Sequence, residues 1–255
     1  MSTSRARLPK SFEVIELRRY TVKPEERASF GRAFETYFPE AFQQLGALIF
    51  GQFNERGDPS RFTWIRGYHD LPSRTAVCHA FYDGPLWREH AGTMNDRLVD
   101  HTDVLLLRPV APAGELPVLP AVDAIAEGAV ELGGAGARGV VAAHIFAVRP
   151  EAIGAAVAQA QRALAAQRDR PDIRPAGLLV SLDVPNDFPR LPVRSDGPFL
   201  VWLAIVPDDE ALAAALGPRA GALAAALAET DALRAPPELV VLEPTPRSRL
   251  RWTAP

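Results

Sequence analysis

The chain has 255 residues, a formal net charge of −3 and one cysteine, Cys78. This charge balance gives no global electrostatic reason to expect nucleic acid or an anionic membrane as a partner. One cysteine excludes an internal disulfide framework and is compatible with a reducing compartment, so we expect a cytoplasmic protein. No apolar run approaches the ~20 residues that a membrane-spanning helix needs, and the length suits two domains of ordinary size.

The first residues predict a strand followed by a helix. Residues 12–20 alternate between apolar and polar side chains, which is typical of a strand, and the run ends at Pro24. Proline is favoured in the first turn of a helix, and residues 25–44 then carry phenylalanine and tyrosine at helical spacing. Gly46 marks the end of this helix.

The next part of the first half predicts a hairpin, a helical region and a last strand. Residues 47–53 and 61–68 are strand-like and are separated by turn-forming residues. Asp70 can cap the helix that follows, and a second helical stretch covers residues 85–98. A strand at 104–108 completes the order β-α-β-β-α-β, which is the ferredoxin-like unit.

The second half predicts the same order of elements. It contains strand 140–148, helix 151–167, strands 175–183 and 198–206, helix 208–229 and strand 238–242. We therefore expect a first domain over residues 1–110, a linker rich in Ala, Gly and Pro over 111–138, and a second domain over 139–255 that ends in a basic tail.

Local sequence echoes support a duplication. The corner at residues 21–25 (TVKPE) returns at 147–151 (AVRPE), Trp64 returns as Trp202, and the strand that ends at Pro109 returns as one that ends at Pro244. Echoes in one order indicate two copies of a supersecondary unit. The predicted fold class is α+β, with two ferredoxin-like repeats whose sheets close into a dimeric α+β barrel arrangement.

The alternation within the strands of the first copy separates two sets of side chains. A ferredoxin-like sheet has helices on one face, so its other face needs a partner. We expect the aliphatic set, with Ile15, Leu17 and Ile65, to lie under the helices. The opposite set would then line the barrel and form the candidate ligand site: Glu16, Arg18, Tyr20, Trp64, Arg66 and Tyr68.

Two interpretations of this charged and aromatic wall remain open. In one, Glu16 pairs with Arg18 and Arg66 and the rings fill the barrel. In the other, an arginine holds an anionic ligand group, a tyrosine donates to a developing oxyanion and Trp64 supplies a flat apolar wall. The second copy has His144 and Ala204 at the positions of Arg18 and Arg66, so the first copy is the candidate for any chemistry.

The first copy resembles the NIPSNAP family nearly from end to end. The resemblance lies in ELRRYTVKP at 16–24, GA at 46–47, GQF at 51–53, FTWIRGY at 62–68 with Arg74, FY at 81–82 with Trp87, and LLLRP at 105–109. It implies the dimeric α+β barrel superfamily, which also holds cofactor-independent monooxygenases, haem-degrading enzymes and chlorite dismutases. The second copy is similar mainly by position, so one subunit would form its own barrel as a pseudo-dimer, and homo-oligomers remain open.

The sequence contains no specific metal or cofactor motif, and we expect neither a metal nor a cofactor. Haem is the alternative that the resemblance implies, because haem-binding relatives in the superfamily use a helix histidine as axial ligand. His90 and His79 lie in predicted helices and are the candidates for that role.

The expected function is binding of a small, anionic or aromatic molecule in the barrel of the first repeat, or a role as an assembly module. The alternative is a cofactor-independent or haem-dependent oxygenase or isomerase. No catalytic residue is assigned, because no nucleophile and base arrangement is recognisable. An open, polar-lined cavity would favour a ligand site, and a filled barrel would favour an assembly module.

Overall fold

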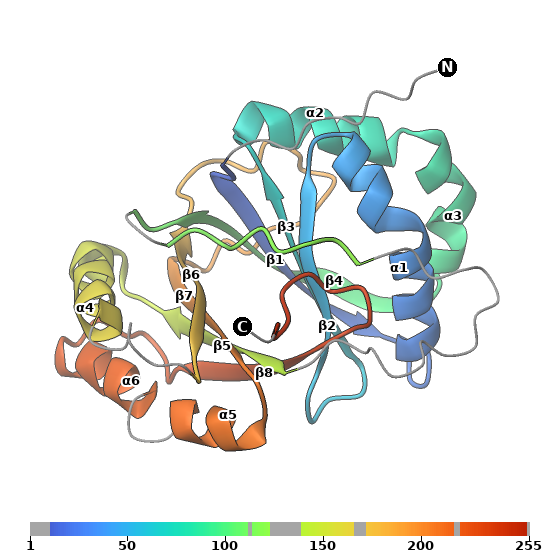
Figure 1. The fold of residues 1–255 in the computed structure, drawn as a ribbon. Helices are drawn as coiled ribbons and strands as arrows, with labels where there is room; N and C mark the ends of the chain where they lie inside the picture. Colours follow the sequence, from blue (N-terminus) through green and yellow to red (C-terminus); the bar gives the residue numbers. More distant parts are fainter. Residues whose placement is uncertain (1–10, 112–113, 123–138, 166–171, 217–219, 254–255) are drawn as a thin grey trace.

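The computed structural model describes residues 11–111, 114–122, 139–165, 172–216 and 220–253 (Figure 1). The first half contains β1 (Val14–Val22), α1 (Arg27–Gln44), β2 (Leu48–Glu55), β3 (Arg61–Tyr68), α2 (Leu71–Tyr82), α3 (Pro85–Asn95) and β4 (Leu98–Pro109). The second half contains β5 (Val140–Ala147), a short 3₁₀ turn (Pro150–Ala152), α4 (Ile153–Ala165), β6 (Arg174–Ser181), β7 (Phe199–Val206), α5 (Asp209–Leu216), α6 (Ala220–Glu229) and β8 (Glu238–Pro244). The two halves therefore repeat one order of strands.

The eight strands close into a single barrel in the order β1-β3-β2-β8-β5-β7-β6-β4. Each repeat supplies four neighbouring strands, and the two sheets join along antiparallel pairs. Phe53 of β2 lies opposite Pro244 of β8, and Leu107 of β4 lies opposite Ser181 of β6. Closure satisfies strand edges that two separate sheets would leave open. This topology confirms the predicted α+β fold of two ferredoxin-like repeats.

The predicted start of α2 and the predicted end of α1 are confirmed. The Asp70 side chain caps α2 by accepting a hydrogen bond from the backbone N–H of Ser73 at 2.8 Å. Gly46 follows α1 with φ of +97°, in the left-handed region that favours glycine.

Two predicted helices have different bounds in the structure. Helical spacing predicts a helix to residue 98, but α3 ends at Asn95 and β4 begins at Leu98. Leu98 lies opposite Val22 of β1, so pairing within the sheet overrides the helical pattern there. The helix expected over 208–229 is described as two segments, α5 and α6.

The barrel interior is filled by apolar side chains from both repeats, most of them aliphatic. Ile15, Leu17 and Ile65 pack in one cluster with Val141 and Leu203, and each of these side chains is buried. Residues of two different sheets can meet in this way only inside the barrel, and an eight-stranded barrel is just wide enough for such filling. The expectation that the aliphatic set lies under the helices is therefore wrong.

The C-terminal residues and part of the predicted linker cover one opening of the barrel (Figure 1). Leu250 and Leu116 join the interior cluster, and the backbone N–H of Leu250 donates to the carbonyl of Phe50 at 2.8 Å. The predicted basic tail thus contacts the first repeat, where Arg247 pairs with Glu40. The division into two domains stays a prediction, and residues 123–138 of the linker lie outside the described residues.

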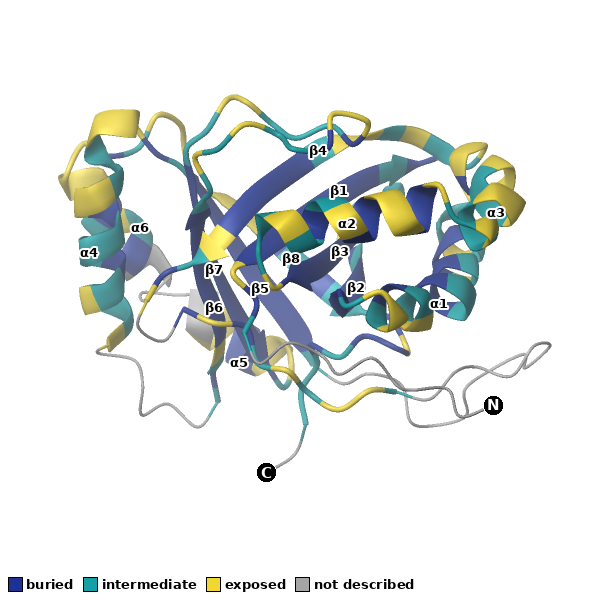
Figure 2. Ribbon diagram, turned by 90° about the horizontal axis from the view of Figure 1, so that it is seen from above, coloured by how far each residue is buried: buried dark blue, intermediate teal, exposed yellow. Residues whose placement is uncertain are grey.

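The helices cover the outer faces of the two sheets. Figure 2 shows strands that are buried along most of their length, whereas the helices expose an outer stripe to solvent. Helices α1, α2 and α3 lie on the first sheet, and α4, α5 and α6 lie on the second (Figure 1). Of the helices in the described residues, none combines the length and the hydropathy of a transmembrane segment.

The shared interior makes a prediction about cooperativity. Leu17→Ala in the first repeat and Leu203→Ala in the second should each lower the free energy of unfolding by about 2–5 kcal/mol, because each leaves a cavity in the same core. Urea denaturation should show one transition that shifts as a whole. Leu239→Ala, at a residue that is 42% exposed, is the control. Two separate transitions would contradict a single cooperative barrel.

Candidate ligand-binding site

All six residues of the predicted site lie on β1 or β3 and are buried. The structure brings them together, but on the helix-covered side of the first sheet. Tyr20, Trp64 and Tyr68 pack in a cluster with aromatic side chains of α1 and with residues of α2. The expected location inside the barrel is therefore corrected: the site lies between the first sheet and helices α1, α2 and α3.

The charged residues of this layer form a buried ion network around Glu16. One carboxylate oxygen, Oε2, accepts hydrogen bonds from Arg66 Nε at 2.6 Å and from Arg18 Nη1 at 2.8 Å. The other oxygen, Oε1, accepts from Arg74 Nε at 2.7 Å. All four side chains are fully buried. We call Glu16, Arg18, Arg66 and Arg74 the Glu16 network.

This network keeps Glu16 ionised despite its burial. Burial alone would raise the pKa of the carboxyl group, but the charges of Arg66, Arg18 and Arg74 outweigh that effect and hold the pKa well below its usual range. Removing one member would leave buried charge without its partner, which is costly.

The predicted site residues did not include Arg74 and Asp187 of this region, nor Tyr82 beside it. Arg74 comes from α2, where it is buried, and it also contacts Asp187 in the loop between β6 and β7. Thr75 donates to the same aspartate. The sequence could have indicated that Arg74 is buried. Arg74 and Cys78 are four residues apart and therefore share one face of α2, which is the buried face. No comparable signal points to Asp187, since its contact joins two repeats that are distant in sequence.

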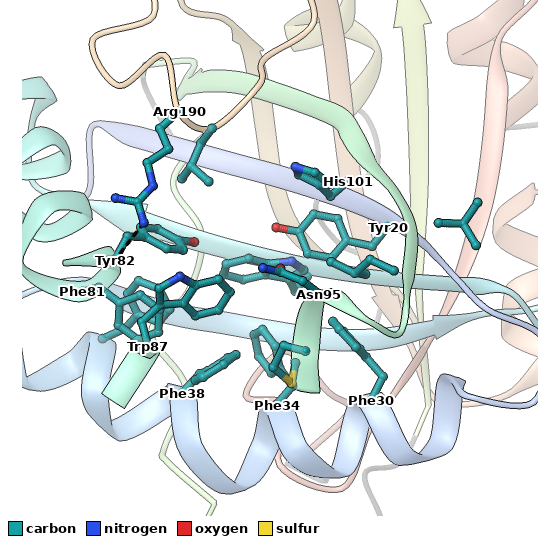
Figure 3. Close-up of a pocket in the computed structure, with 16 residues that line it drawn as sticks. Tyr20, Phe30, Phe34, Phe38, Phe81, Tyr82, Trp87, Asn95, His101 and Arg190 are labelled. Carbon is teal, nitrogen blue, oxygen red and sulfur yellow. Dashed lines mark hydrogen bonds between the residues drawn. The ribbon is translucent and has the colours of Figure 1, made fainter. Parts of the chain in front are cut away.

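A cavity of about 370 Å³ lies beside the Glu16 network (Figure 3). This volume lies within the usual range for small-molecule sites. Aromatic rings make most of its wall, and polar groups are few. Its lining residues are Tyr20, Phe30, Phe34, Phe38, Phe42, Trp64, Phe81, Tyr82, Trp87, Met94, Asn95, Leu98, Val99, His101, Arg190 and Leu191.

Two tyrosine hydroxyl groups face each other across this cavity (Figure 3). Arg18 Nε donates to the hydroxyl oxygen of Tyr20 at 2.9 Å, and Arg66 Nη1 donates to that of Tyr82 at 3.2 Å. Each phenol oxygen thus accepts a charge-assisted hydrogen bond, which leaves its own O–H to donate. Two donors that converge on one space can hold a single oxygen atom of a ligand.

Burial sets the protonation state of Tyr82. Removal from water raises the pKa of its phenol to about 12, although the charge of Arg66 opposes part of this rise. Tyr82 is therefore protonated at neutral pH and acts as a hydrogen-bond donor, not as a base.

The mouth of the cavity combines residues of both repeats. His101 of β4 meets the Tyr20 ring edge to face at 6.2 Å between centroids. Arg190 and Leu191 come from the loop between β6 and β7 of the second repeat. Arg190 donates to Asp83 at 2.6 Å and to the carbonyl of Tyr82 at 3.0 Å, so the loop is attached to the end of α2.

The histidines proposed for haem do not fit the cavity. His79 is exposed and hydrogen-bonds Asp83 at 3.2 Å, and His90 stacks on Tyr37 with ring centroids 3.8 Å apart. Neither residue lines the cavity. Within the described residues there is also no cluster of three or more side chains that could hold a metal ion. Neither His79 nor His90 could therefore ligate a haem bound in this cavity.

The corresponding layer of the second repeat holds a hydrophobic cluster. His144 lies opposite Trp202 on β5 and β7, as Arg18 lies opposite Trp64 on β1 and β3. Trp202 packs against small and aliphatic side chains of α4 and α6, including Ala156, Ala160, Leu223 and Leu227. Among the described residues, His144 Nε2 and Trp202 Nε1 are buried without a hydrogen-bond partner.

Comparison with known proteins relates the first repeat to a family. Residues 15–113 match the family model described as NIPSNAP. This match confirms the resemblance that the sequence predicts for the first copy. The comparison with curated proteins gave no match.

Solved structures share the fold over nearly the whole chain. One is described as a putative monooxygenase from Lactobacillus acidophilus, with 11% identity, a TM-score of 0.56, and coverage of 92% of this chain and 94% of the other. Another, from Fusobacterium nucleatum and described in the same words, has 10% identity, a TM-score of 0.57, and coverage of 96% and 100%. An anthrone oxidase-like protein has 11% identity, a TM-score of 0.57, and coverage of 96% and 98%. At these identities the likeness shows a common fold.

The Glu16 network makes a prediction about stability. Glu16→Gln should lower the free energy of unfolding by about 3–5 kcal/mol, because three buried guanidinium groups lose their shared anion. Glu243→Gln is the control, since Glu243 forms a more exposed ion pair with Arg56 and should cost about 1 kcal/mol or less. Chemical denaturation at neutral pH measures both. Equal losses in the two variants would contradict a central role for Glu16.

Because His144 is buried, we expect the free energy of unfolding to depend on pH. Burial lowers the pKa of its imidazole from 6.5 to about 4 in the folded protein. The unfolded chain therefore binds the proton first as the pH falls, and stability contributed by neutral His144 is lost between about pH 6.5 and pH 4. The loss should reach about 3 kcal/mol. His144→Leu should remove this component from the curve of unfolding free energy against pH, and an unchanged curve would contradict it.

Proposed function

We propose that the first repeat binds a small, flat aromatic molecule that carries a phenol or ketone oxygen. The observation that supports this most directly is the pair of hydroxyl groups of Tyr20 and Tyr82, which converge in a cavity with mostly aromatic walls. Each hydroxyl is held by a buried arginine. An assembly module would need neither the cavity nor these two donors.

The wall of the cavity favours an aromatic ligand. Phe34 and Trp64 meet edge to face at 4.9 Å between ring centroids, and Phe38 meets Phe81 in the same way at 5.3 Å. Aromatic rings prefer offset or edge-to-face partners, so a flat ring would find favourable contacts on several sides. Such a ligand would also bury its apolar surface, which is the main source of affinity in small-molecule sites.

The two tyrosines would orient the ligand. A ketone or phenol oxygen between them would accept two hydrogen bonds from donors whose positions are set by the Glu16 network. Because each phenol oxygen already accepts from a guanidinium group, its O–H is polarised and becomes a stronger donor. This arrangement would discriminate between an aromatic ligand with an oxygen and the same ring without one.

Oxygenation of an enolisable aromatic ketone is a second candidate function. In that reaction the substrate would lose a proton from a CH₂ carbon to solvent and form an enolate whose oxygen lies between the tyrosines. Dissolved O₂ would accept two electrons as it forms a C–O bond at that carbon, and the resulting hydroperoxide, once protonated, would eliminate water to leave a second ketone. Preorganised donors of this kind stabilise an oxyanion in the transition state. The fold similarity to an anthrone oxidase-like protein and to proteins described as putative monooxygenases supports this candidate.

The binding proposal predicts a difference between 2-naphthol and naphthalene. Calorimetry should show that the wild-type protein prefers 2-naphthol, and that Tyr20→Phe and Tyr82→Phe each weaken its binding about tenfold through loss of one hydrogen bond. Tyr37→Phe is a matched control, because Tyr37 stacks on His90 outside the cavity. Equal affinity for both compounds, unaffected by either Phe variant, would rule the proposal out.

The oxygenase candidate predicts O₂ uptake with an anthrone-type ketone. The wild-type rate should exceed the rate without protein, and Tyr82→Phe should reduce it by roughly 10²-fold, as for loss of one oxyanion donor. An oxygen electrode measures both rates. If O₂ uptake with the protein is no faster than in buffer, the oxygenase candidate is rejected. The binding proposal is tested separately by calorimetry.

A further inference from the structure

We propose that the cavity selects the ionised form of its aromatic ligand, a phenolate or an enolate, because the buried charges behind the two tyrosines are not balanced. This inference rests on the proposed function and specifies the chemical state of the ligand. It derives from the number and position of charged groups in the first repeat.

The buried charges leave an excess of one positive charge. Arg18, Arg66 and Arg74 are fully buried, and the carboxylates that contact them in the described structure are Glu16 and Asp187. Three guanidinium groups therefore face two carboxylates. A buried charge without a counterion is unfavourable, so the folded protein would gain from an anion near this network.

The excess charge lies directly behind the wall of the cavity. The guanidinium carbon of Arg18 is 5.5 Å from the ring centroids of both Tyr20 and Trp64, and both rings line the cavity. Within the described residues, Arg18 Nη2 is buried without a hydrogen-bond partner. A buried guanidinium N–H without a partner is unfavourable, so it would gain from a nearby acceptor. A ligand oxyanion would interact with this charge through the hydroxyl of Tyr20.

Among the described residues, the other elements around the cavity contribute no carboxylate to its wall. Helix α1 contributes phenylalanines to the wall, α3 contributes Trp87, Met94 and Asn95, and β4 contributes His101. The loop of the second repeat contributes Arg190, which is paired with Asp83 at the end of α2. No carboxylate is among the lining residues of the described cavity. Behind the wall, Tyr68 and Cys78 are the further titratable groups near Arg66.

Asp187 of the second repeat contributes one negative charge to the balance of buried charges in the first repeat. Its carboxylate contacts Arg74 from the outer side, where 24% of the aspartate side chain remains exposed. Asp187 is not among the lining residues, so it can change the charge without changing the wall. Asp187→Asn would raise the excess from one positive charge to two.

The test is a spectroscopic titration of bound 4-nitrophenol, whose phenol and phenolate forms absorb at different wavelengths. In the wild-type protein the pKa of the bound probe should lie at least about one unit below that of the free probe, which equals a tenfold preference for the phenolate. Asp187→Asn should lower the bound pKa further. Tyr82→Phe should raise it, and Tyr37→Phe should leave it at the wild-type value. The methyl ether 4-nitroanisole, which cannot ionise, should bind at least tenfold more weakly.

The outcomes separate the two proposals. If 4-nitrophenol binds with an unchanged or raised pKa, burial dominates over the excess charge, and the inference is overturned while the binding proposal stands. If neither probe binds, the binding proposal fails and the inference fails with it. If the Asp187→Asn protein folds and the pKa of bound 4-nitrophenol equals its value in the wild-type protein, the charge balance does not control the ionisation of the ligand, and the inference is overturned. If that variant does not fold, the wild-type titration still decides.

Discussion

Three guanidinium groups share the carboxylate of Glu16, and the first repeat is organised around this interaction. Arg18 and Arg66 extend from β1 and β3 and place the hydroxyl groups of Tyr20 and Tyr82 through direct hydrogen bonds. Arg74 ties α2 to the same carboxylate and reaches Asp187 in the second repeat. Two polar groups of the cavity wall, the hydroxyls of Tyr20 and Tyr82, are therefore hydrogen-bonded to one connected set of buried charges.

The two repeats share a fold but differ in what lies between sheet and helices. In the first repeat, large aromatic rings and an ion network leave a cavity. In the second, Ala160 and Leu227 pack against the sheet, and His144 takes the strand position that Arg18 has in the first. The second repeat supplies half of the barrel and the loop at the mouth of the cavity. The second repeat can therefore do without charged residues between its sheet and its helices, because only the apolar face of its sheet contributes to the barrel interior.

Much of the fold could be predicted from local patterns. Alternation separates Glu16 and Arg18 from Ile15 and Leu17, and the repeated corners predict two copies of one unit. The pattern could not say which face lies inside the barrel, since both faces are buried. The lumen holds a cluster of apolar side chains, including the rings of Phe50 and Phe199, whereas the layer under the helices holds the ionised Glu16 network. The aliphatic set therefore fills the lumen, and the candidate site moves to the opposite side of the sheet.

The sequence by itself determined the order of the strands, the duplication and the six residues that gather on one face of β1 and β3. Only the tertiary structure decided that this face lies under α1 and α2, that Arg74 completes the Glu16 network, and that Asp187 and Arg190 arrive from the second repeat. The reason is physical. Periodicity reports neighbours along one strand or helix, but a charge pair between distant segments exists only after the barrel has closed.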